Sequence, residues 1–168
     1  PANGSIQRLY AEDTNLIIFQ ENKVSKSLID KDAIYSAEGN ASVTSRNLVI
    51  GQNVAFGGEF GISTDPESFA VNGYRKYFTD RDQNIVCRLS MDGITPISNF
   101  GMIDFFRDKL STAKIGGVKG GWDAHNKQYV LSIESNSNNK GVSEYNTLSF
   151  DESVKGWTSL FDYKPNQI

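Results

Sequence analysis

Short apolar runs separated by turn residues recur along most of this chain, a pattern that is typical of antiparallel β structure. The clearest stretch is residues 59–98, where four such runs follow one another. The runs predict strands at Ser68–Val71, Tyr74–Thr79, Ile85–Ser90 and Ile94–Ile97. Asn, Asp and Gly are frequent between them, and these residues favour tight turns. Residues 59–98 should therefore form a four-strand meander.

A second four-strand meander is predicted in residues 118–162. Its strands are expected at Val118–Asp123, Gln128–Ile133, Asn146–Phe150 and Gly156–Phe161. Between the meanders, residues 99–117 hold apolar positions 102, 103, 106 and 110, which recur at the spacing of one helical face. This spacing predicts one short helix at Met102–Leu110, with Asn99 as a candidate N-terminal cap.

The N-terminal third has a weaker pattern. Asn15–Gln20 and Lys23–Ile29 predict a hairpin around the turn Glu21–Asn22. Residues 31–58 hold short apolar patches among turn residues, so we expect an extended excursion there that becomes ordered on a neighbouring molecule. The predicted organisation is a hairpin plus excursion at 10–58, a meander at 59–98, a helix and linker at 99–117 and a meander at 118–162.

Composition supports a turn-rich β fold. Gly, Ser and Asn contribute 15, 18 and 15 residues, or 48 of 168, and they favour turns over helix interiors. Meanders of roughly 30–45 residues have the length of β-propeller blades. We therefore predict an all-β, mainly antiparallel fold of partial β-propeller-like meanders with one short helix. The meanders should pack on each other and at least half bury Phe78, Leu89, Trp122, Leu131 and Trp157.

Charge and rare residues narrow the functional classes. Lys and Arg number 17 against 20 Asp and Glu, so the chain lacks the basic excess typical of nucleic-acid-binding domains. No apolar run approaches the about 18 residues of a membrane-spanning helix. The single cysteine, Cys87, excludes an internal disulfide and a cysteine-rich zinc cluster, and the single histidine, His125, excludes a two-histidine metal site.

The candidate metal and turn motifs favour structural roles. Asp80–Asn84 matches the start of a calcium loop, but Ile85 and Met91 stand where glycine and glutamate are needed, which favours a solvated hairpin turn. Ser90–Thr95 and Ser149–Thr158 are similar to Asp-box hairpins of propellers, in which the aspartate binds nearby backbone amides.

No catalytic arrangement emerges from the remaining candidates. Cys87 lies in mid-strand, where we expect it to be buried and inert, and His125 lies in a hairpin turn. Core packing is favoured over sugar stacking for both tryptophans. The glycines of residues 57–61 lack the motif of a phosphate-binding loop. A clamp of three arginines for a carboxylate ligand is disfavoured, because all three fall in one hairpin: Arg75, Arg81 and Arg88. We predict no catalytic, cofactor-binding or metal-binding residues, and no cofactor.

Several strings of the sequence together resemble a known family. They are Gly58–Ala70, Tyr74–Asp80, Val86–Gly93, Gly101–Leu110, Trp122–Asp123 and Gly156–Ser159. The chain resembles, over about residues 10–162, large tail structural proteins of the stabilisation or tail-nozzle (muzzle) type of crAss-like and related bacteriophages. The resemblance implies a β-propeller-bearing virion component that assembles with other tail proteins and is not an enzyme.

The two ends fit a longer polypeptide. The chain starts at Pro1, and Asp162–Ile168 has the composition of a linker, so we expect a fragment of a larger chain. The family members are themselves much longer.

Two other functions stay open. One is a carbohydrate-binding or carbohydrate-cleaving tail receptor module that meets a host surface glycan. Cleavage would need paired carboxylates, and the candidates all fall at predicted hairpin tips: Asp80, Asp82, Asp92, Asp123 and Asp151. The other is a propeller scaffold that binds a peptide.

Overall fold

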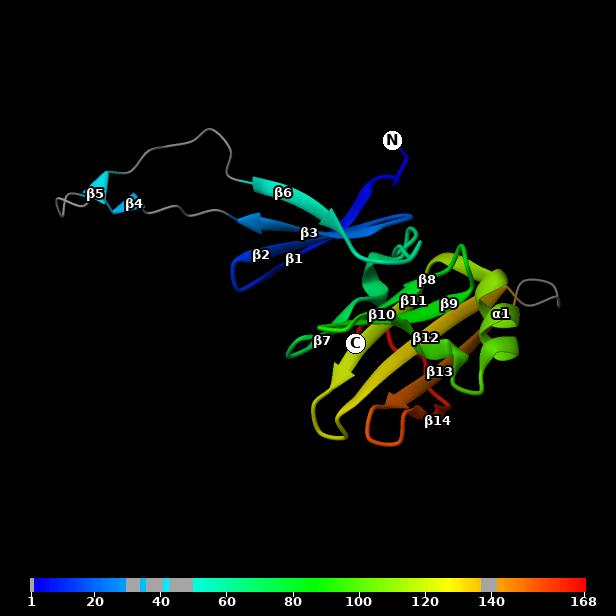
Figure 1. The fold of residues 1–168 in the computed structure, drawn as a ribbon. Coiled ribbons are helices and arrows are strands. Elements are labelled where there is room, and N and C mark those ends of the chain that lie inside the picture. The colour runs from blue at the N-terminus through cyan, green and yellow to red at the C-terminus, as the bar shows by residue number, and fades with distance from the viewer. Residues whose placement is uncertain (1, 30–33, 36–40, 43–49, 137–141) are drawn as a thin grey trace.

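Antiparallel hairpins account for nearly all of the regular structure in the computed structural model (Figure 1), which describes residues 2–29, 34–35, 41–42, 50–136 and 142–168. Within these residues the strands form three four-stranded sheets and one two-stranded ribbon. The predicted fold class, mainly antiparallel β meanders with one short helix, is confirmed.

The two predicted meanders are the second and third sheets. The second sheet contains β7 (Ala70–Asn72), β8 (Arg75–Asp80), β9 (Ile85–Ser90) and β10 (Gly93–Pro96). The third contains β11 (Ala113–Asp123), β12 (Gln128–Asn136), β13 (Ser143–Asp151) and β14 (Gly156–Phe161). In both sheets the spatial order follows the chain, as a meander requires. β11 begins earlier than predicted because an irregularity between Ala113 and Val118 lets a linker-like segment pair with β12.

The first sheet was only partly predicted. Its β2 (Asn15–Gln20) and β3 (Val24–Ile29) are the predicted hairpin. β1 (Ile6–Glu12) and β6 (Ile50–Ala55) add a strand at each edge, in the order β1-β2-β3-β6. The expected excursion is thus partly a strand, and it also contains the ribbon of β4 (Ile34–Tyr35) and β5 (Ala41–Ser42). The rest of it lies outside the described residues.

The one α-helix, α1 (Ile103–Ser111), begins one residue after the predicted start. Met102 takes the N-cap position and makes no side-chain capping bond. The predicted cap, Asn99, instead ends the short 3-10 helix η2 (Ile97–Asn99). Phe106 and Leu110 of α1 are buried against the second and third sheets, so the helix closes one end of the core between them.

The second sheet is buried on both faces, because successive residues of a strand point to opposite sides. Phe78, on one face, packs with Phe19 of the first sheet. Tyr77, on the other, stacks on Tyr129 of the third sheet. The sheets therefore pack face to face in chain order, and the five residues predicted to be at least half buried are fully or partly buried.

Close backbone contacts hold the sheets together. The Tyr129 hydroxyl donates to the carbonyl of Ser68, at the end of the 3-10 helix η1 (Pro66–Ser68), over 2.7 Å. A Cβ atom on Gly120 would lie 2.2 Å from the same carbonyl oxygen, so only glycine allows β11 to approach this segment. Lys76 and Glu12 form a buried ion pair between β8 and β1. These contacts position the hairpin ends described next.

A candidate binding groove at the hairpin ends

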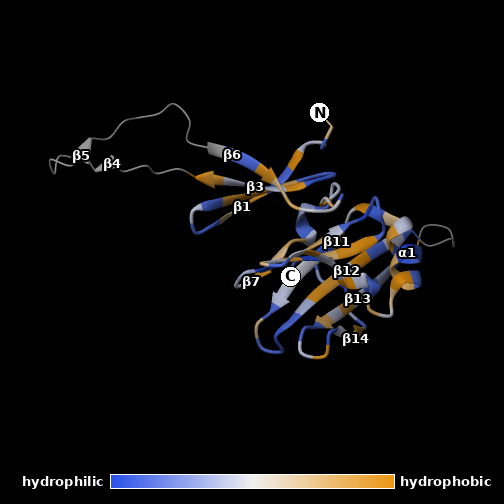
Figure 2. Cartoon of the chain, viewed as in Figure 1, coloured by the Kyte–Doolittle hydropathy of each residue, from blue (hydrophilic) through white to orange (hydrophobic). Residues whose placement is uncertain are grey.

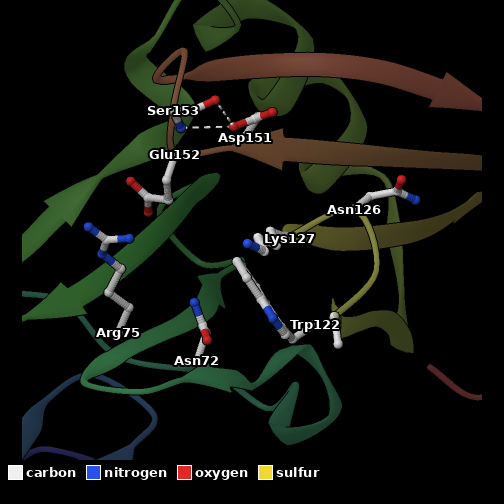
Figure 3. Close-up of a pocket in the computed structure, with 9 residues that line it drawn as sticks. Asn72, Arg75, Trp122, Asn126, Lys127, Asp151, Glu152 and Ser153 are labelled. Carbon is white, nitrogen blue, oxygen red and sulfur yellow. Dashed lines mark hydrogen bonds between the residues drawn. The ribbon is translucent and has the colours of Figure 1, made fainter.

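A groove lies where the hairpin ends of the second and third sheets meet (Figure 3). Its volume is about 640 Å³. It is lined by Asn72, Arg75, Trp122, Ala124, Asn126, Lys127, Asp151, Glu152 and Ser153. A neighbouring hollow of about 530 Å³ shares Asn72, Arg75 and Glu152 and reaches the β9–β10 turn at Ser90–Asp92. Together they form one polar groove that crosses two sheets.

Glu152 ties the two sheets together at this groove. It lies in the turn between β13 and β14, and its Oε1 accepts a hydrogen bond from the Tyr77 hydroxyl over 2.8 Å. Its other oxygen pairs with Arg88 of β9. Burial and the bond to Glu152 raise the pKa of the Tyr77 hydroxyl well above its usual value. Both carboxylate oxygens of Glu152 are thus used within the protein.

Two aspartates of the hairpin turns accept bonds from nearby backbone groups, which the Asp-box resemblance predicted for Asp151 but not for Asp123. Asp151 accepts hydrogen bonds from the backbone NH and the hydroxyl of Ser153. Asp123 accepts from the backbone NH groups of His125 and Asn126. These bonds stabilise the charged carboxylates and lower the pKa of both aspartates. Neither is placed as a proton donor at neutral pH.

The two tryptophans differ in position. Trp157 packs on Phe106 and Phe150 and donates its Nε1–H to the carbonyl of Ile97 over 3.1 Å, so its predicted core role is confirmed. Trp122 stacks on Tyr77 and also lines the groove, where Figure 3 shows its indole edge-on beside Lys127. The predicted core packing is thus confirmed for Trp122 as well, and this residue also lines the groove.

The three arginines considered as a clamp do not converge. Arg75 lines both hollows of the groove, and Arg88 lines the second hollow and pairs with Glu152. Arg81 lies elsewhere, 3.1 Å from the buried carboxylate of Asp65. Burial raises the pKa of Asp65, and the neighbouring Arg81 opposes that effect.

The prediction that Asp80 lies in a solvated hairpin turn is wrong, because its side chain is buried. Its carboxylate accepts hydrogen bonds from the backbone NH of Gly61, the Ser63 hydroxyl and both the backbone and the side chain of Gln83. Burial raises its pKa, and the hydrogen bonds oppose that effect. Asp80 therefore anchors the 57–65 loop to the turn after β8.

The remaining candidate residues lie apart from the groove or at its margin. Cys87 is buried between the first and second sheets, where burial raises the pKa of its thiol, and His125 is exposed in the β11–β12 turn. Asp82 and Asp92 are exposed in the turns after β8 and β9. Across the described ranges, no group of three or more His, Cys, Asp or Glu side chains could hold a metal ion. No helix in the described part is long and apolar enough to cross a membrane.

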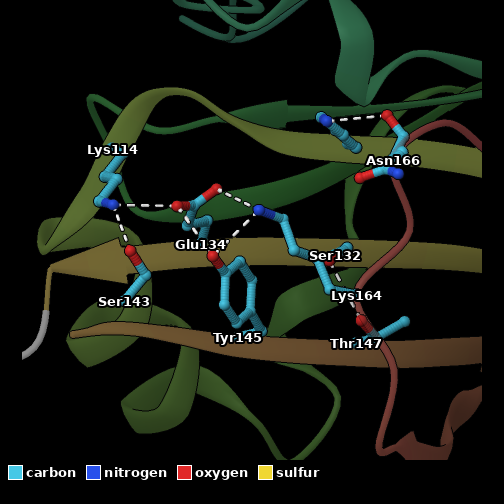
Figure 4. Close-up of polar contacts among 9 residues, drawn as sticks. Lys114, Ser132, Glu134, Ser143, Tyr145, Thr147, Lys164 and Asn166 are labelled. Atoms are coloured by element: carbon cyan, nitrogen blue, oxygen red, sulfur yellow. Dashed lines mark hydrogen bonds and ion pairs between the residues drawn. The ribbon is translucent and has the colours of Figure 1, made fainter.

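The outward face of the third sheet is polar and carries the C-terminal segment, residues 162–168 (Figure 4). Glu134 pairs with Lys114 at 2.9 Å and with Lys164 at 3.7 Å. The Thr147 hydroxyl donates to the carbonyl of Tyr163, and Lys119 donates to the carbonyl of Asn166. The segment predicted as a linker therefore crosses β11 and β13 and covers this face.

The sequence patterns did not predict that Glu152 joins the second and third sheets. Its neighbour Asp151 was noticed because aspartate in a turn has a known local bonding pattern. Glu152 acts on residues 64 and 75 positions away along the chain, which no local pattern reports. Comparison with protein-family models gives no match for this chain, and comparison with curated proteins gives none either.

Proposed function

We propose that this chain is a structural component of a bacteriophage tail, of the nozzle or stabilisation type that it resembles, and that it acts in the virion by assembly with other tail proteins. The observation that supports assembly is an apolar patch on the outward face of the first sheet. Figure 2 shows hydrophobic residues along β1, one of the two strands that carry this patch.

The apolar patch comprises Ile6, Leu9, Leu16 and Ile18. Leu9 lies directly opposite Ile18 in the β1–β2 register, on the face that points away from the buried Phe19. Ile6 and Leu9 are 57% and 53% exposed. Exposed aliphatic groups gathered on one sheet face are typical of protein–protein contacts.

The third sheet, at the opposite end of the stack of sheets, has no such apolar patch among the residues described on its outward face. The third sheet's outward face is polar and already carries residues 162–168 (Figure 4). Propeller rings typically close with four or more blades, whereas the described residues form three such sheets. The first sheet is therefore the end that gains most from an apolar partner, either another tail protein or another part of the same protein.

Electron cryo-microscopy of a virion that encodes this sequence tests the proposal. The three sheets should fit density in the tail, with a neighbouring chain on the apolar patch. A virion in which the chain is absent, or a tail map in which that face meets solvent, would refute it. Hydrogen exchange of the free chain and of assembled tails should show added protection of β1 and β2 only in tails.

A second candidate function is carbohydrate binding, favoured by the groove that holds Trp122 among polar side chains. Glycosidases use two free carboxyl groups about 5–10 Å apart. Of the three acids that line the groove, Asp151 and Glu152 are held by protein donors, which leaves Asp92 as a single carboxylate and not a pair. We therefore propose binding without cleavage, and a reducing-sugar assay should detect no release from glycans.

A further inference from the structure

We propose that the groove binds a carboxylate-bearing sugar, with Arg75 pairing the carboxylate and Trp122 contacting the sugar ring. This inference rests on the second candidate function, carbohydrate binding, and does not depend on assembly. It follows from the charges of the groove, from its aromatic wall and from its amide groups.

The groove has an unused positive charge. Glu152 is shared by Tyr77 and Arg88, so one arginine already neutralises it. Arg75 lies beside Glu152 in Figure 3, but it makes no ion pair with any described residue, and neither does Lys127. Over both hollows of the groove four cations thus meet three carboxylates: Arg75, Arg88, Lys127 and Lys155 against Asp92, Asp151 and Glu152. A ligand anion would restore the balance.

Arginine is suited to a carboxylate because its planar guanidinium donates two parallel hydrogen bonds to the two oxygens. Arg75 is exposed at the start of β8, so its guanidinium can reach a ligand without unfolding any part of the sheet. Lys127, in the turn after β11, borders the same groove. The pair places positive charge on two sides of the space that a ligand would fill.

The aromatic wall is rigid. Trp122 stacks on Tyr77 with ring centres 5.8 Å apart, and Tyr77 stacks on the buried Tyr129 at 4.7 Å. The indole is therefore held by a column of rings, while its Nε1–H has no acceptor among the described residues. Such a fixed ring offers an apolar surface beside a polar donor, which suits the C–H face and the hydroxyls of a sugar.

Amide groups complete the site. Asn72, at the end of β7, and Asn126, in the β11–β12 turn, line the groove, and beyond the bond that Asn126 donates to Asp123 their amides offer donors and acceptors to hydroxyl groups. The volume lies within the range of small-molecule pockets. An acidic peptide would satisfy Arg75 but would not need the rigid ring with amides around it. The combination favours an acidic sugar.

The test compares two acidic probes, 3′-sialyllactose and trigalacturonate, with neutral lactose by titration calorimetry. At least one acidic probe should bind more tightly than lactose. Arg75→Gln should weaken that binding by about tenfold or more, the effect of losing a charge-assisted hydrogen bond. Arg107→Gln, an exposed arginine on α1, is the matched control and should change nothing.

Nuclear magnetic resonance locates the ligand. The indole N–H signal of Trp122 should shift on addition of the sugar, whereas that of Trp157, which is bonded to Ile97, should not. Equal affinity for lactose and both acidic probes would overturn the acidic specificity and leave carbohydrate binding intact. Failure of all three sugars to bind would overturn both. Arg75-dependent binding of hexaglutamate in place of the sugars would assign the groove to an acidic peptide.

Discussion

Single side chains join separate segments of this chain, and Asp80 does so with four hydrogen bonds. Its four hydrogen bonds come from residues in the 57–65 loop and in the following turn. All four partners are donors, so a carboxylate satisfies each of them. An amide at this position would turn one acceptor into a donor that faces another donor.

Asp80→Asn should therefore lower the free energy of unfolding by about 1–3 kcal/mol, the range for a buried polar group left without its partner. Urea unfolding followed by fluorescence would measure the change. Asp82→Asn is the matched control, because Asp82 is exposed two residues further on, and it should stay within about 0.5 kcal/mol of the unchanged protein. Equal stability of the two variants would contradict the anchoring role of Asp80.

The tight packing around Gly120 leads to a second prediction for a single residue. A methyl group there would meet the Ser68 carbonyl at 2.2 Å and the Tyr129 hydroxyl at 2.5 Å. Gly120→Ala should cost about 1–3 kcal/mol, as overpacked sites do, measured by thermal unfolding. Gly156→Ala is the control, since the nearest atom to its Cβ would be 3.9 Å away, and a similar loss there would rule out the steric explanation.

Among the elements, the strands that were predicted differ physically from those that were missed. β12 buries the largely apolar run Tyr129–Ile133, and β13 alternates Thr147 and Ser149 with the apolar Leu148 and Phe150, so both patterns are strong in the sequence. β1 and β6 are edge strands whose polar residues, such as Arg8 and Gln52, weaken the alternation. Both strands gain their order from backbone pairing with β2 or β3, which their side-chain patterns report poorly.

The groove was less predictable than the fold. Trp122 and Arg75 were identified as candidates from residue type alone, but their meeting depends on how the second sheet packs on the third. That packing brings Tyr77 next to Trp122, and the sequence distance between them hides the contact. For Lys127 and Asn72 the sequence predicted only turn positions and gave no indication of a binding role.

The C-terminal segment should respond to pH. Lys114 lowers the pKa of the Glu134 carboxyl below its ordinary value of 4.5, and Lys164 adds to this effect. A lowered carboxyl pKa contributes stability that is present above about pH 4.5 and is lost as the pH falls through the lower folded-state value. The amide signals of Tyr163 and Lys164 should therefore move toward those of a free segment as the solution is acidified below pH 4.5.

Glu134→Gln should loosen the same segment already at neutral pH. The control is Glu144→Gln, because Glu144 also has a lowered pKa but pairs with Lys109 of α1 and not with Lys164. Amide signals of the segment that stay unchanged in Glu134→Gln would show that the backbone bonds of Thr147 and Lys119 hold it alone.

For the whole molecule, the apolar patch on the first sheet is the feature on which the proposed assembly depends. Leu9→Lys should prevent incorporation into phage tails, because a charge would be buried at the contact. The isolated chain should change in stability by only about 0.5 kcal/mol, since Leu9 is more than half exposed. The measurement is the amount of chain recovered in purified virions. Leu160→Lys, at a leucine of β14 that is 67% exposed, should incorporate normally, and equal recovery of both variants would count against the patch.

The two buried faces of the second sheet also affect how the protein is made. Synthesis completes the first sheet at Ala55 and the second at Pro96, but the third only at Phe161. While the ribosome adds that last stretch, Tyr77 and its neighbours have no partner and meet water. A nascent chain arrested after Pro96 should bind a hydrophobic dye and be cut readily by protease, whereas one arrested after the exit of Phe161 should resist both. Each ribosome would thus carry an intermediate with exposed apolar side chains, so crowded polysomes are where chaperones would matter most for this protein.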